Sequence, residues 1–452
     1  MPQCFPTDRA LLWERRGTIS RKELFGKVGT LSAQLPDCRY AINLCGGRGA
    51  FLIGLMAALQ RGQVTLLPPS RASGVVREFK RNYPASHILI DGNASDLEGP
   101  VTTIDTDALS PSADPAPFKP HPDQIAVVAF TSGSTGETSA HEKSWASVEA
   151  GAHLAAERFG LGPETGIIAT VPPQHMYGLE TSIFYPLIAD CSVHAGRPIF
   201  PAEIRDAIAE VETAKRLLIT TPIHLRSIVK TRLDWPKLDA VISATAPLGV
   251  ELARQAEERL AAPVHEIYGC TEAGSIANRR TVASDIWTLY SGVTFSATDT
   301  DGRPVVHGGH VVQPTPLSDI LDRLDPTRFR LLGRSADQVS IAGKRASLGD
   351  LNARLNAING VEDGAFIVRG SDRDGEVQRL GCLFVSASLD EQALIAALGQ
   401  LIDPAFLPRP IRRVDRLPRN ALGKLPRLQL LALLDPAESA RQRAGGASIS
   451  AA

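Results

Sequence analysis

Four short segments carry residue types that could bind a nucleotide and activate a substrate. The first, Thr131 to Glu137 (TSGSTGE), directly follows an apolar run at residues 125–130. Small residues in such a loop let backbone N–H groups and hydroxyls close around phosphate oxygens. It is not a P-loop, because no Gly-Lys-Ser/Thr follows the glycines. The segment therefore indicates either a phosphate-binding loop or a Ser/Gly-rich surface turn.

The second segment, Tyr268 to Glu272 (YGCTE), offers a carboxylate. Beside a phosphate loop, a carboxylate can hold Mg²⁺, which prefers oxygen ligands. Taken alone, Glu272 could equally be a solvated glutamate in a loop.

The third segment is Leu332 to Gln338 (LGRSADQ), and Asp319 lies fourteen residues before its Gly333. A carboxylate can accept both ribose hydroxyls, and an arginine can add a contact. The alternative is a surface loop with an ion pair. The fourth, Leu417 to Arg427 (LPRNALGKLPR), places a lysine on a Pro/Gly-bounded loop. Such a lysine can reach a neighbouring domain's site as a point charge, or it can belong to a solvated basic turn.

The elements around these segments predict an α/β protein. Apolar strands alternate with helices up to about residue 270, which is typical of a parallel sheet. Residues 281–332 carry strand and turn signals without long helices, and residues 100–122 have the composition of a surface loop. The expected strands cover residues 39–44, 63–67, 87–91 and 125–130, and the expected helices residues 20–31 and 50–59.

The character of the chain changes near residue 334. Beyond it we expect strands at residues 338–341, 365–368, 380–385 and 411–414, and helices at 348–359 and 391–401. We therefore predict a large domain of layered α/β subdomains with a β-rich lobe, residues 1–334. A small mobile α+β domain would cover residues 335–437, and residues 438–452 would form a disordered tail.

Composition excludes several classes of protein. Of 452 residues, 43% are apolar and 21% charged, and the net charge of -1 favours neither a nucleic acid nor an acidic membrane surface as partner. The six cysteines are scattered without a CxxC pair, so we expect a reduced, cytoplasmic protein. The N-terminus lacks the apolar region of a signal peptide, and the apolar run at residues 51–59 is too short to insert across a bilayer.

Together and in this order, the segments resemble those of the acyl-adenylating superfamily. That superfamily contains acyl-CoA synthetases, aryl-acid ligases, the adenylation domains of peptide synthetases and luciferases. TSGSTG, YGCTE, GRSADQVSIAGKR and LPRNALGK match four of its core motifs, and the resemblance extends from roughly residue 40 to residue 430. It implies ATP and Mg²⁺ as cofactors and a carboxylic acid as substrate.

The resemblance also implies a role for each matched residue. Glu272 would hold Mg²⁺, Thr271 would touch the α-phosphate, and Lys424 would bridge the substrate carboxylate and the α-phosphate. The ATP phosphates would be covered by Thr131, Ser132, Gly133, Ser134, Thr135 and Gly136. The other nucleotide contacts would come from Thr245, Ala246, Pro247, Tyr268 and Gly269 near the adenine, and from Asp319 and Arg334 at the ribose. His175, Tyr177 and Gly269 would line the acid pocket, Ala336 and Asp337 would form the hinge, and Gly343 would flank a thiol tunnel.

Two positions depart from the family pattern. The phosphate loop of the family usually continues with Pro-Lys, whereas Ser139 stands at the lysine position here and Lys143 follows four residues later. Lys143 could replace the missing lysine. The position that carries an acidic hinge residue in the family holds Ala336 here, and Asp337 follows it.

The resemblance predicts an ATP-dependent, AMP-forming ligase that joins an acid to a thiol. Residues 62–70 (GQVTLLPPS) and the segment from TSGSTG to Lys143-Ser-Trp145 are most similar to ligases of bacterial aryl-polyene and xanthomonadin pigment pathways. Those enzymes load an aryl acid such as 4-hydroxybenzoate onto an acyl carrier protein. An aryl- or fatty acyl-CoA synthetase using CoA is the alternative. Outside this class, a P-loop kinase or NTPase and a catalytically dead binding module are the competing hypotheses.

Overall fold

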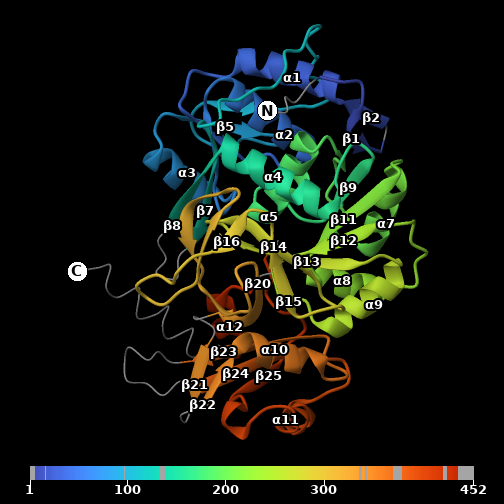
Figure 1. Cartoon of the computed structure of the whole chain (residues 1–452), viewed down its shortest axis with the longest axis vertical. Helices are drawn as coiled ribbons and strands as arrows, with labels where there is room; N and C mark the ends of the chain where they lie inside the picture. Colours follow the sequence, from blue (N-terminus) through green and yellow to red (C-terminus); the bar gives the residue numbers. More distant parts are fainter. Residues whose placement is uncertain are drawn as a thin grey trace. The chain divides into compact units, whose positions relative to one another are not determined.

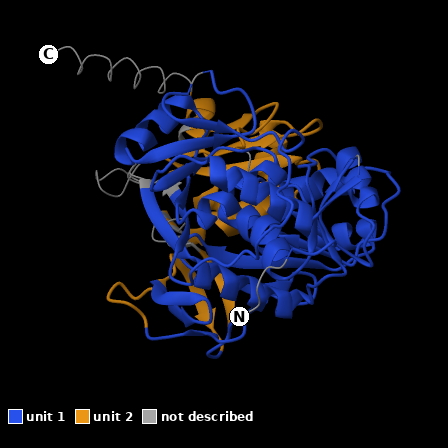
Figure 2. Cartoon of the chain, turned by 90° about the horizontal axis from the view of Figure 1, so that it is seen from above, with its two compact units in different colours: residues 1–297, 305–315, 325–328 blue, residues 298–304, 316–324, 329–452 orange. Residues whose placement is uncertain are grey.

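The chain forms two compact units (Figure 2), described separately below. Unit 1 contains Met1–Ala297, Val305–Thr315 and Asp325–Arg328, and unit 2 contains Thr298–Pro304, Pro316–Leu324 and Phe329–Ala452. The computed structural model describes residues 6–15, 17–95, 97–132, 138–334, 338–341, 344–369, 379–420 and 425–435. The domain limits predicted at residues 334 and 437 stay a prediction, and the predicted tail lies outside the described residues. Among the described helices, none combines the length and apolar character needed to span a membrane.

Unit 1 is built on two sheets. The first has the strand order β6-β5-β3-β4-β7-β8 and is parallel except for β8, which pairs antiparallel with β7. Its strands are β3 (Tyr40–Asn43), β4 (Val64–Leu67), β5 (Ser86–Ile90), β6 (Val101–Thr103), β7 (Ile125–Ser132) and β8 (Thr138–Ser144). The parallel order matches the alternation of strands and helices in the sequence, because a parallel crossover needs a long connection.

The second sheet of unit 1 runs in the order β15-β14-β13-β12-β11-β9-β10-β1-β2. Its strands are β1 (Ala10–Glu14), β2 (Gly17–Ser20), β9 (Thr165–Ala169), β10 (Ser192–His194), β11 (Lys215–Thr220), β12 (Ala240–Ser243), β13 (Val264–Cys270), β14 (Gly274–Arg280) and β15 (Ile286–Leu289). A small sheet of β16 (Val293–Phe295), β17 (Val305–Gly308) and β18 (Val311–Pro316) lies within the β-rich region predicted for residues 281–332, and β16 pairs antiparallel with β17.

Strand residues of both sheets point alternately into two cores. Ile167 and Ala169 of β9 join the core that also takes Phe51 and Trp145 from the helices, whereas Ile168 between them packs with the opposite core. The same alternation separates the two faces of the first sheet. The central parallel strands are therefore buried on both faces, which explains why they are mainly apolar.

Helices supply the layers that cover these faces. Ser20 caps α1 by accepting a bond from Glu23 N, as predicted from the sequence, and Ser144 caps α4 in the same way. The helices of unit 1 are α1 (Arg21–Gln34), α2 (Arg48–Gln60), α3 (Ser73–Asn82), α4 (Trp145–Phe159), α5 (Met176–Leu179), the π-helix η1 (Glu180–Phe184), α6 (Tyr185–Ile188), α7 (Pro201–Glu210), α8 (Pro222–Val229) and α9 (Val250–Leu260). Figure 1 labels all of these except η1 and α6.

Arg48, the first residue of α2, is fully buried. Its guanidinium donates to the backbone oxygens of His194 at 2.6 Å and Gly196 at 2.5 Å, and to those of Ala169 and Val171 at 3.2 Å. Burial lowers the pKa of Arg48 to about 9, and the positive charge of Arg197 adds to the effect. One side chain thus joins a helix of the first sheet to the ends of β9 and β10 in the second.

Unit 2 packs two apolar cores around a three-stranded sheet of order β23-β24-β25. Its strands are β19 (Asp319–Arg323), β20 (Arg328–Arg334), β21 (Gln338–Ile341), β22 (Lys344–Ser347), β23 (Asp363–Arg369), β24 (Arg379–Val385) and β25 (Ile411–Arg413). Its helices are α10 (Leu348–Ala357), α11 (Glu391–Gly399), the 3₁₀ turn η4 (Pro404–Phe406) and α12 (Arg427–Leu434). The mixed α/β architecture predicted from the sequence is confirmed.

Candidate active site

The predicted phosphate loop is flanked by two strands of unit 1 that pair antiparallel. Thr131 and Ser132 end β7, and their partners across the ladder are Ser139 and Thr138 of β8. The residues between them, Gly133 to Gly136 among others, lie outside the described residues. Ser139, at the position of the family's lysine, is exposed. A strand therefore leads into this loop as predicted, and a second strand leaves it.

Lys143 of β8 is buried, with an exposed fraction of only 6%. Its ammonium donates to the backbone oxygen of Glu272, on a segment more than a hundred residues away. Burial lowers the pKa of Lys143, and the carboxylates of Glu180 and Glu272 oppose that shift. In this structure Lys143 holds the YGCTE segment, a role that its position in the sequence did not reveal.

The YGCTE segment is shaped by a bulge between β13 and β14. Tyr268 pairs with Ala277, but Gly269 pairs with Ser275, so the register shifts by one residue between them. A Cβ on Gly269 would lie 2.1 Å from the backbone oxygen of Gly274, which leaves no room for any other residue. Bulges of this kind re-aim side chains beside active sites. Here the bulge is followed by the turn that contains Thr271 and Glu272.

Glu272 is accessible at the tip of this turn, with 47% of its side chain exposed. One carboxylate oxygen lies 3.7 Å from Nε2 of His141 on β8. Among the described residues, no group of three His, Cys, Asp or Glu side chains could hold a metal ion. A single accessible carboxylate still fits Mg²⁺, which keeps several waters and takes substrate phosphates as its other ligands.

The predicted adenine segment, residues 243–248, is fixed by a buried carboxylate. Glu266 of β13 accepts from Leu248 N at 2.9 Å, from Thr281 Oγ1 at 2.8 Å and from Arg279 at 2.8 and 2.5 Å. Thr245, between the strand and this anchor, has φ +78°, a strained value for a β-branched residue. Such strain persists only where the surroundings impose it, and it concentrates at functional sites.

Tyr268, predicted to lie near the adenine, is buried against Trp287 of β15. Their ring centroids are 5.7 Å apart. The guanidinium of Arg279 lies over the Trp287 ring, 4.7 Å from its centroid. Arg279 thus connects the carboxylate of Glu266 to the Trp287 ring, against which Tyr268 packs. The arrangement makes the wall of the nucleotide segment rigid.

The predicted acid-gate segment is a helix interrupted by a π turn. His175 precedes α5, and Gly178 packs so closely on Pro172 that a Cβ would lie 2.0 Å from its backbone oxygen. The hydroxyl of Tyr177 reaches the backbone oxygens of Thr220 at 3.1 Å and Ile242 at 2.9 Å, and burial raises its pKa well above the ordinary value. The Tyr177 hydroxyl is therefore committed to the ends of β11 and β12. The π turn that follows, η1, is a feature that recurs at functional sites.

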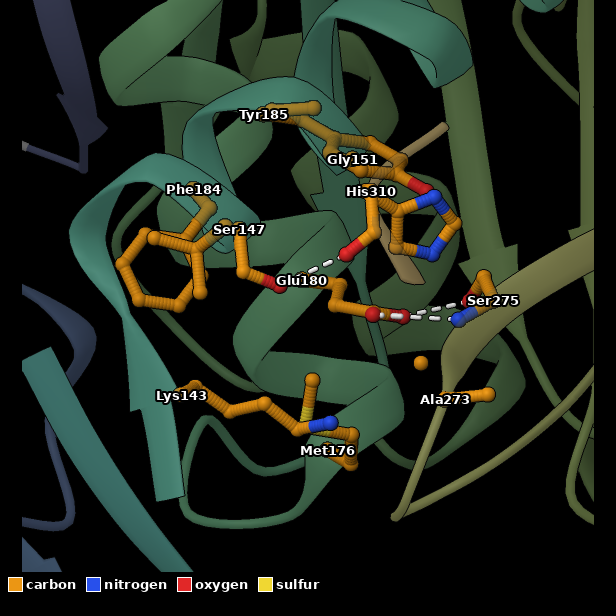
Figure 3. A pocket seen from close by; sticks show the side chains of 13 residues that line it. Lys143, Ser147, Gly151, Met176, Glu180, Phe184, Tyr185, Ala273, Ser275 and His310 are labelled. Atoms are coloured by element: carbon orange, nitrogen blue, oxygen red, sulfur yellow. Dashed lines mark hydrogen bonds between the residues drawn. The ribbon is translucent and has the colours of Figure 1, made fainter. Parts of the chain in front are cut away.

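Glu180, the first residue of η1, faces the strand that follows the Glu272 turn (Figure 3). Its carboxyl accepts from the backbone N–H of Ser275 at 3.1 Å and from the Ser275 hydroxyl. Burial raises the pKa of Glu180, and the two bonds from Ser275 oppose that rise. Lys143, Glu180, Ser275 and His310 line one pocket. Sequence analysis missed Glu180 and His310; a charged residue within the apolar helix MYGLETSIF was a signal for the first.

In unit 2, the predicted ribose residues are neighbours. Asp319 and Arg334 are directly opposite in the β19–β20 ladder, so the structure brings this pair together. Arg419 of the LPRNALGK segment binds Asp363 through Nε at 2.8 Å and Nη2 at 2.6 Å, which anchors the chain five residues before Lys424. Lys424 itself, the hinge pair Ala336 and Asp337, and Gly343 lie outside the described residues.

Comparisons with known proteins agree on one family. The model of the family described as "AMP-binding enzyme" matches residues 34–312. The chain is 30% identical over 309 residues to a 4-coumarate–CoA ligase of Halorhodospira halophila, covering 65% of this chain and 73% of that protein. It is 23% identical over 365 residues to a D-alanine–D-alanyl carrier protein ligase of Lacticaseibacillus rhamnosus, covering 68% and 70%.

The fold is also similar to solved structures. One is the o-succinylbenzoate coenzyme A synthetase of Bacillus subtilis in complex with ATP and a magnesium ion. It superimposes with a TM-score of 0.79 at 18% identity, covering 94% of this chain and 97% of that one.

Proposed function

The chain belongs to the AMP-binding enzyme family, and we propose that within it the protein adenylates a hydroxybenzoate-like aryl acid and loads it onto an acyl carrier protein. As a member of that family it is an ATP-dependent, AMP-forming acid–thiol ligase. The observation that carries the proposal is the turn bearing Glu272, which is accessible at its tip and adjoins a pocket that is part polar and part apolar.

The first half-reaction makes a poor acyl donor reactive. A carboxylate oxygen attacks the α-phosphorus of ATP, pyrophosphate leaves, and the acyl group is then attached to AMP as a good leaving group. Both reactants are anionic, so the reaction needs positive charge where negative charge builds up. Glu272 would hold Mg²⁺, which supplies part of that charge when bound, and Lys424 would supply an ammonium beside the α-phosphate.

The bulge and Lys143 support this role for the Glu272 turn. Electrostatic catalysis requires groups that are already oriented before the reaction. Lys143 fixes the backbone of Glu272, and the close approach of Gly269 to Gly274 fixes the turn from its other side. Thr271, between these two points, is proposed to contact the α-phosphate. We therefore assign Lys143 to positioning this turn rather than to contacting phosphate.

In the second half-reaction a thiol sulfur attacks the acyl carbonyl and AMP leaves. The family resemblance supports a hinge at Ala336 and Asp337 and a thiol path beside Gly343. A carrier protein as the thiol donor is supported by the pigment-ligase resemblance of residues 62–70 and 131–145 and by the similarity to a carrier protein ligase. Exposed Arg409, Arg412, Arg413 and Arg416 on unit 2 would also attract an acidic protein partner. CoA remains the alternative acceptor, because the chain is also similar to a CoA ligase.

A screen of acids and acceptors tests the proposal. Pyrophosphate release is measured with benzoate, 4-hydroxybenzoate and a fatty acid, with either CoA or a phosphopantetheinylated carrier protein as acceptor. We expect the fastest release with 4-hydroxybenzoate and the carrier protein. Pyrophosphate release with the fatty acid but with neither aryl acid would refute the aryl assignment. Acylation of CoA without acylation of the carrier protein would refute the carrier protein as acceptor.

The role of Lys424 is tested by ATP–pyrophosphate exchange. Lys424→Ala should lower exchange about 100-fold or more, in line with the loss of other groups that stabilise developing charge. Lys237→Ala is the matched control, because the Lys237 side chain is 75% exposed and forms a loose ion pair with Asp239 at 3.4 Å. Equal exchange in both variants would contradict the role assigned to Lys424.

A further inference from the structure

A pocket of unit 1 lies beside the Glu272 turn and has two kinds of wall (Figure 3). Phe184, Val148 and Ala152 give it an apolar side, and Glu180, Ser275 and His310 give it a polar side. The polar groups come from η1, β14 and the segment between β17 and β18, so the fold gathers them from distant parts of the chain. The free space is about the size of one water molecule.

His310 is the unusual member of this pocket. Its exposed fraction is 5%, and neither ring nitrogen makes a hydrogen bond of good geometry, although the Ala273 backbone is close enough to the ring to form a weak one. Burial lowers the pKa of His310 to about 4, and the charge of Lys143 adds to the shift, so the ring is neutral at pH 7. A neutral imidazole offers one N–H donor and one acceptor. Leaving such a buried group unpaired costs about 1–3 kcal/mol, which a ligand could recover.

The imidazole is held in place from behind. The hydroxyl of Ser147 donates to the backbone oxygen of His310 at 2.9 Å. The ring also lies on Gly151, where an added Cβ would be 3.3 Å from Cδ2. The orientation of the ring is therefore set by the protein before any ligand arrives, as recognition of a specific group requires.

Glu180 and His310 approach the same point in space. A Cβ on Gly274 would lie 2.6 Å from Oε1 of Glu180 and 3.4 Å from Nε2 of His310. Gly274 has φ +77°, so glycine is favoured there for its backbone as well as for the space that it leaves. One small polar group beside Gly274 could thus meet both the carboxyl and the imidazole.

The polar wall lies close to the turn at which the substrate carboxylate is proposed to react. Ser275 follows Glu272 by three residues, and Lys143 both lines the pocket and donates to the Glu272 backbone, so the pocket adjoins the turn that would receive the carboxylate. An acid with its carboxylate near Thr271 and Glu272 would therefore bring the far end of an aromatic ring close to this wall. The water-sized space would take the hydroxyl at the end of the ring.

We propose that Glu180 and His310 form a subsite that recognises a hydroxyl group on the acid, at the end of the ring remote from its carboxylate. This inference rests on the proposed function and specifies its substrate class. The hydroxyl would donate to Glu180 or accept from His310, and Ser275 would keep the carboxyl oriented. An acid without the hydroxyl would leave the His310 ring without this partner, although Glu180 would keep its bonds from Ser275, and it would bind more weakly.

The test compares 4-hydroxybenzoate with benzoate in ATP–pyrophosphate exchange, using the full chain. We expect the wild type to favour 4-hydroxybenzoate in kcat/KM by about tenfold to a hundredfold, the range expected for a hydrogen bond involving a charged or buried group. In His310→Phe, which keeps a ring and removes both nitrogens, and in Glu180→Gln, this preference should fall several-fold. The ratio of the two acids is the readout, so a general loss of activity does not imitate the result.

Matched controls separate recognition from folding. His265→Phe replaces a half-buried histidine that contacts Phe159 and lies outside the pocket, and Glu210→Gln replaces a carboxylate paired with His194. Both should keep the wild-type preference. Binding of each acid is also measured by calorimetry without ATP, where the same preference should appear.

The outcomes distinguish this inference from the function on which it rests. If no acid supports exchange, the proposed function fails and the subsite fails with it. If exchange occurs but the wild type does not favour the hydroxylated acid, the space holds a resident water only and the inference is overturned. It is also overturned if His310→Phe and Glu180→Gln both keep the wild-type ratio.

Discussion

The buried pair between Glu266 and Arg279 should carry much of the stability of the nucleotide segment. Only 4% of the Glu266 side chain and 18% of the Arg279 side chain are exposed. In Arg279→Met the carboxylate stays buried and keeps only Leu248 N and Thr281 Oγ1 as donors. Removing one partner of a buried pair costs about 3–5 kcal/mol, because the remaining charge is left uncompensated.

The neighbouring residue on the same strand provides the control. Arg280 pairs with Glu257, but 48% of its side chain is exposed, so Arg280→Met should cost at most about 1 kcal/mol. The double variant Glu266→Gln with Arg279→Met removes the stranded charge and should recover a large part of the loss. Each free energy of unfolding is measured by urea titration followed by far-UV circular dichroism.

The same variants should affect ATP binding. Glu266 holds Leu248 N, and Leu248 ends the segment proposed to contact the adenine. We therefore expect KM for ATP to rise in Arg279→Met and to stay near the wild-type value in Arg280→Met. The reasoning is refuted if Arg279→Met is no less stable than Arg280→Met, or if the double variant is as unstable as Arg279→Met alone.

Two further predictions concern acid sensitivity and the bulge. Burial lowers the pKa of His87 to about 4, so the unfolded chain, with an ordinary value near 6.5, binds more protons and stability falls as the pH falls below 6.5. His87→Leu should reduce the slope of unfolding free energy between pH 6.5 and 5 by up to about 1.4 kcal/mol per pH unit, and an unchanged slope in urea titrations would contradict this. In Gly269→Ala the free energy of unfolding should fall by about 1–3 kcal/mol, because the new Cβ meets the Gly274 backbone. Most of the ATP–pyrophosphate exchange activity should be lost as well. Gly249→Ala, with open space around the new Cβ, is the control, and equal stability of the two variants in thermal unfolding would show the bulge to be tolerant.

Local elements followed well from the sequence because they depend on nearby residues. The strand expected at residues 338–341 is β21 with the same bounds, and Ser20 caps α1 as expected. Residues 100–122 were expected to be a loop, but Val101–Thr103 pairs with β5 as a short edge strand. Its three residues are too few to carry a pattern. The strand β8 was also missed, because the polar run TSAHEKS shows no apolar alternation.

The motifs were readable, but the contacts around them were not. The sequence placed Glu272 in a candidate site. The hydrogen bond from Lys143 to the Glu272 backbone depends on how two separate sheets pack together. Lys143 was considered only as a replacement for a phosphate-loop lysine. His310 enters the pocket from the segment after β17, 130 residues beyond Glu180 in the chain, so no local pattern could join them. Spacing identifies chemistry along the chain, and long-range packing decides which groups meet.

Arg48 links the two sheets of unit 1 in a way that bears on how the unit folds. Its acceptors are backbone oxygens at the ends of β9 and β10, about 120 to 150 residues further along the chain. If the first sheet formed alone, Arg48 would lack these four acceptors, and α2 would lose the apolar core that it shares with β9. The segment spanning β3 to β7 is therefore a poor candidate for an autonomous folding unit. The two sheets should gain and lose their structure in one cooperative step.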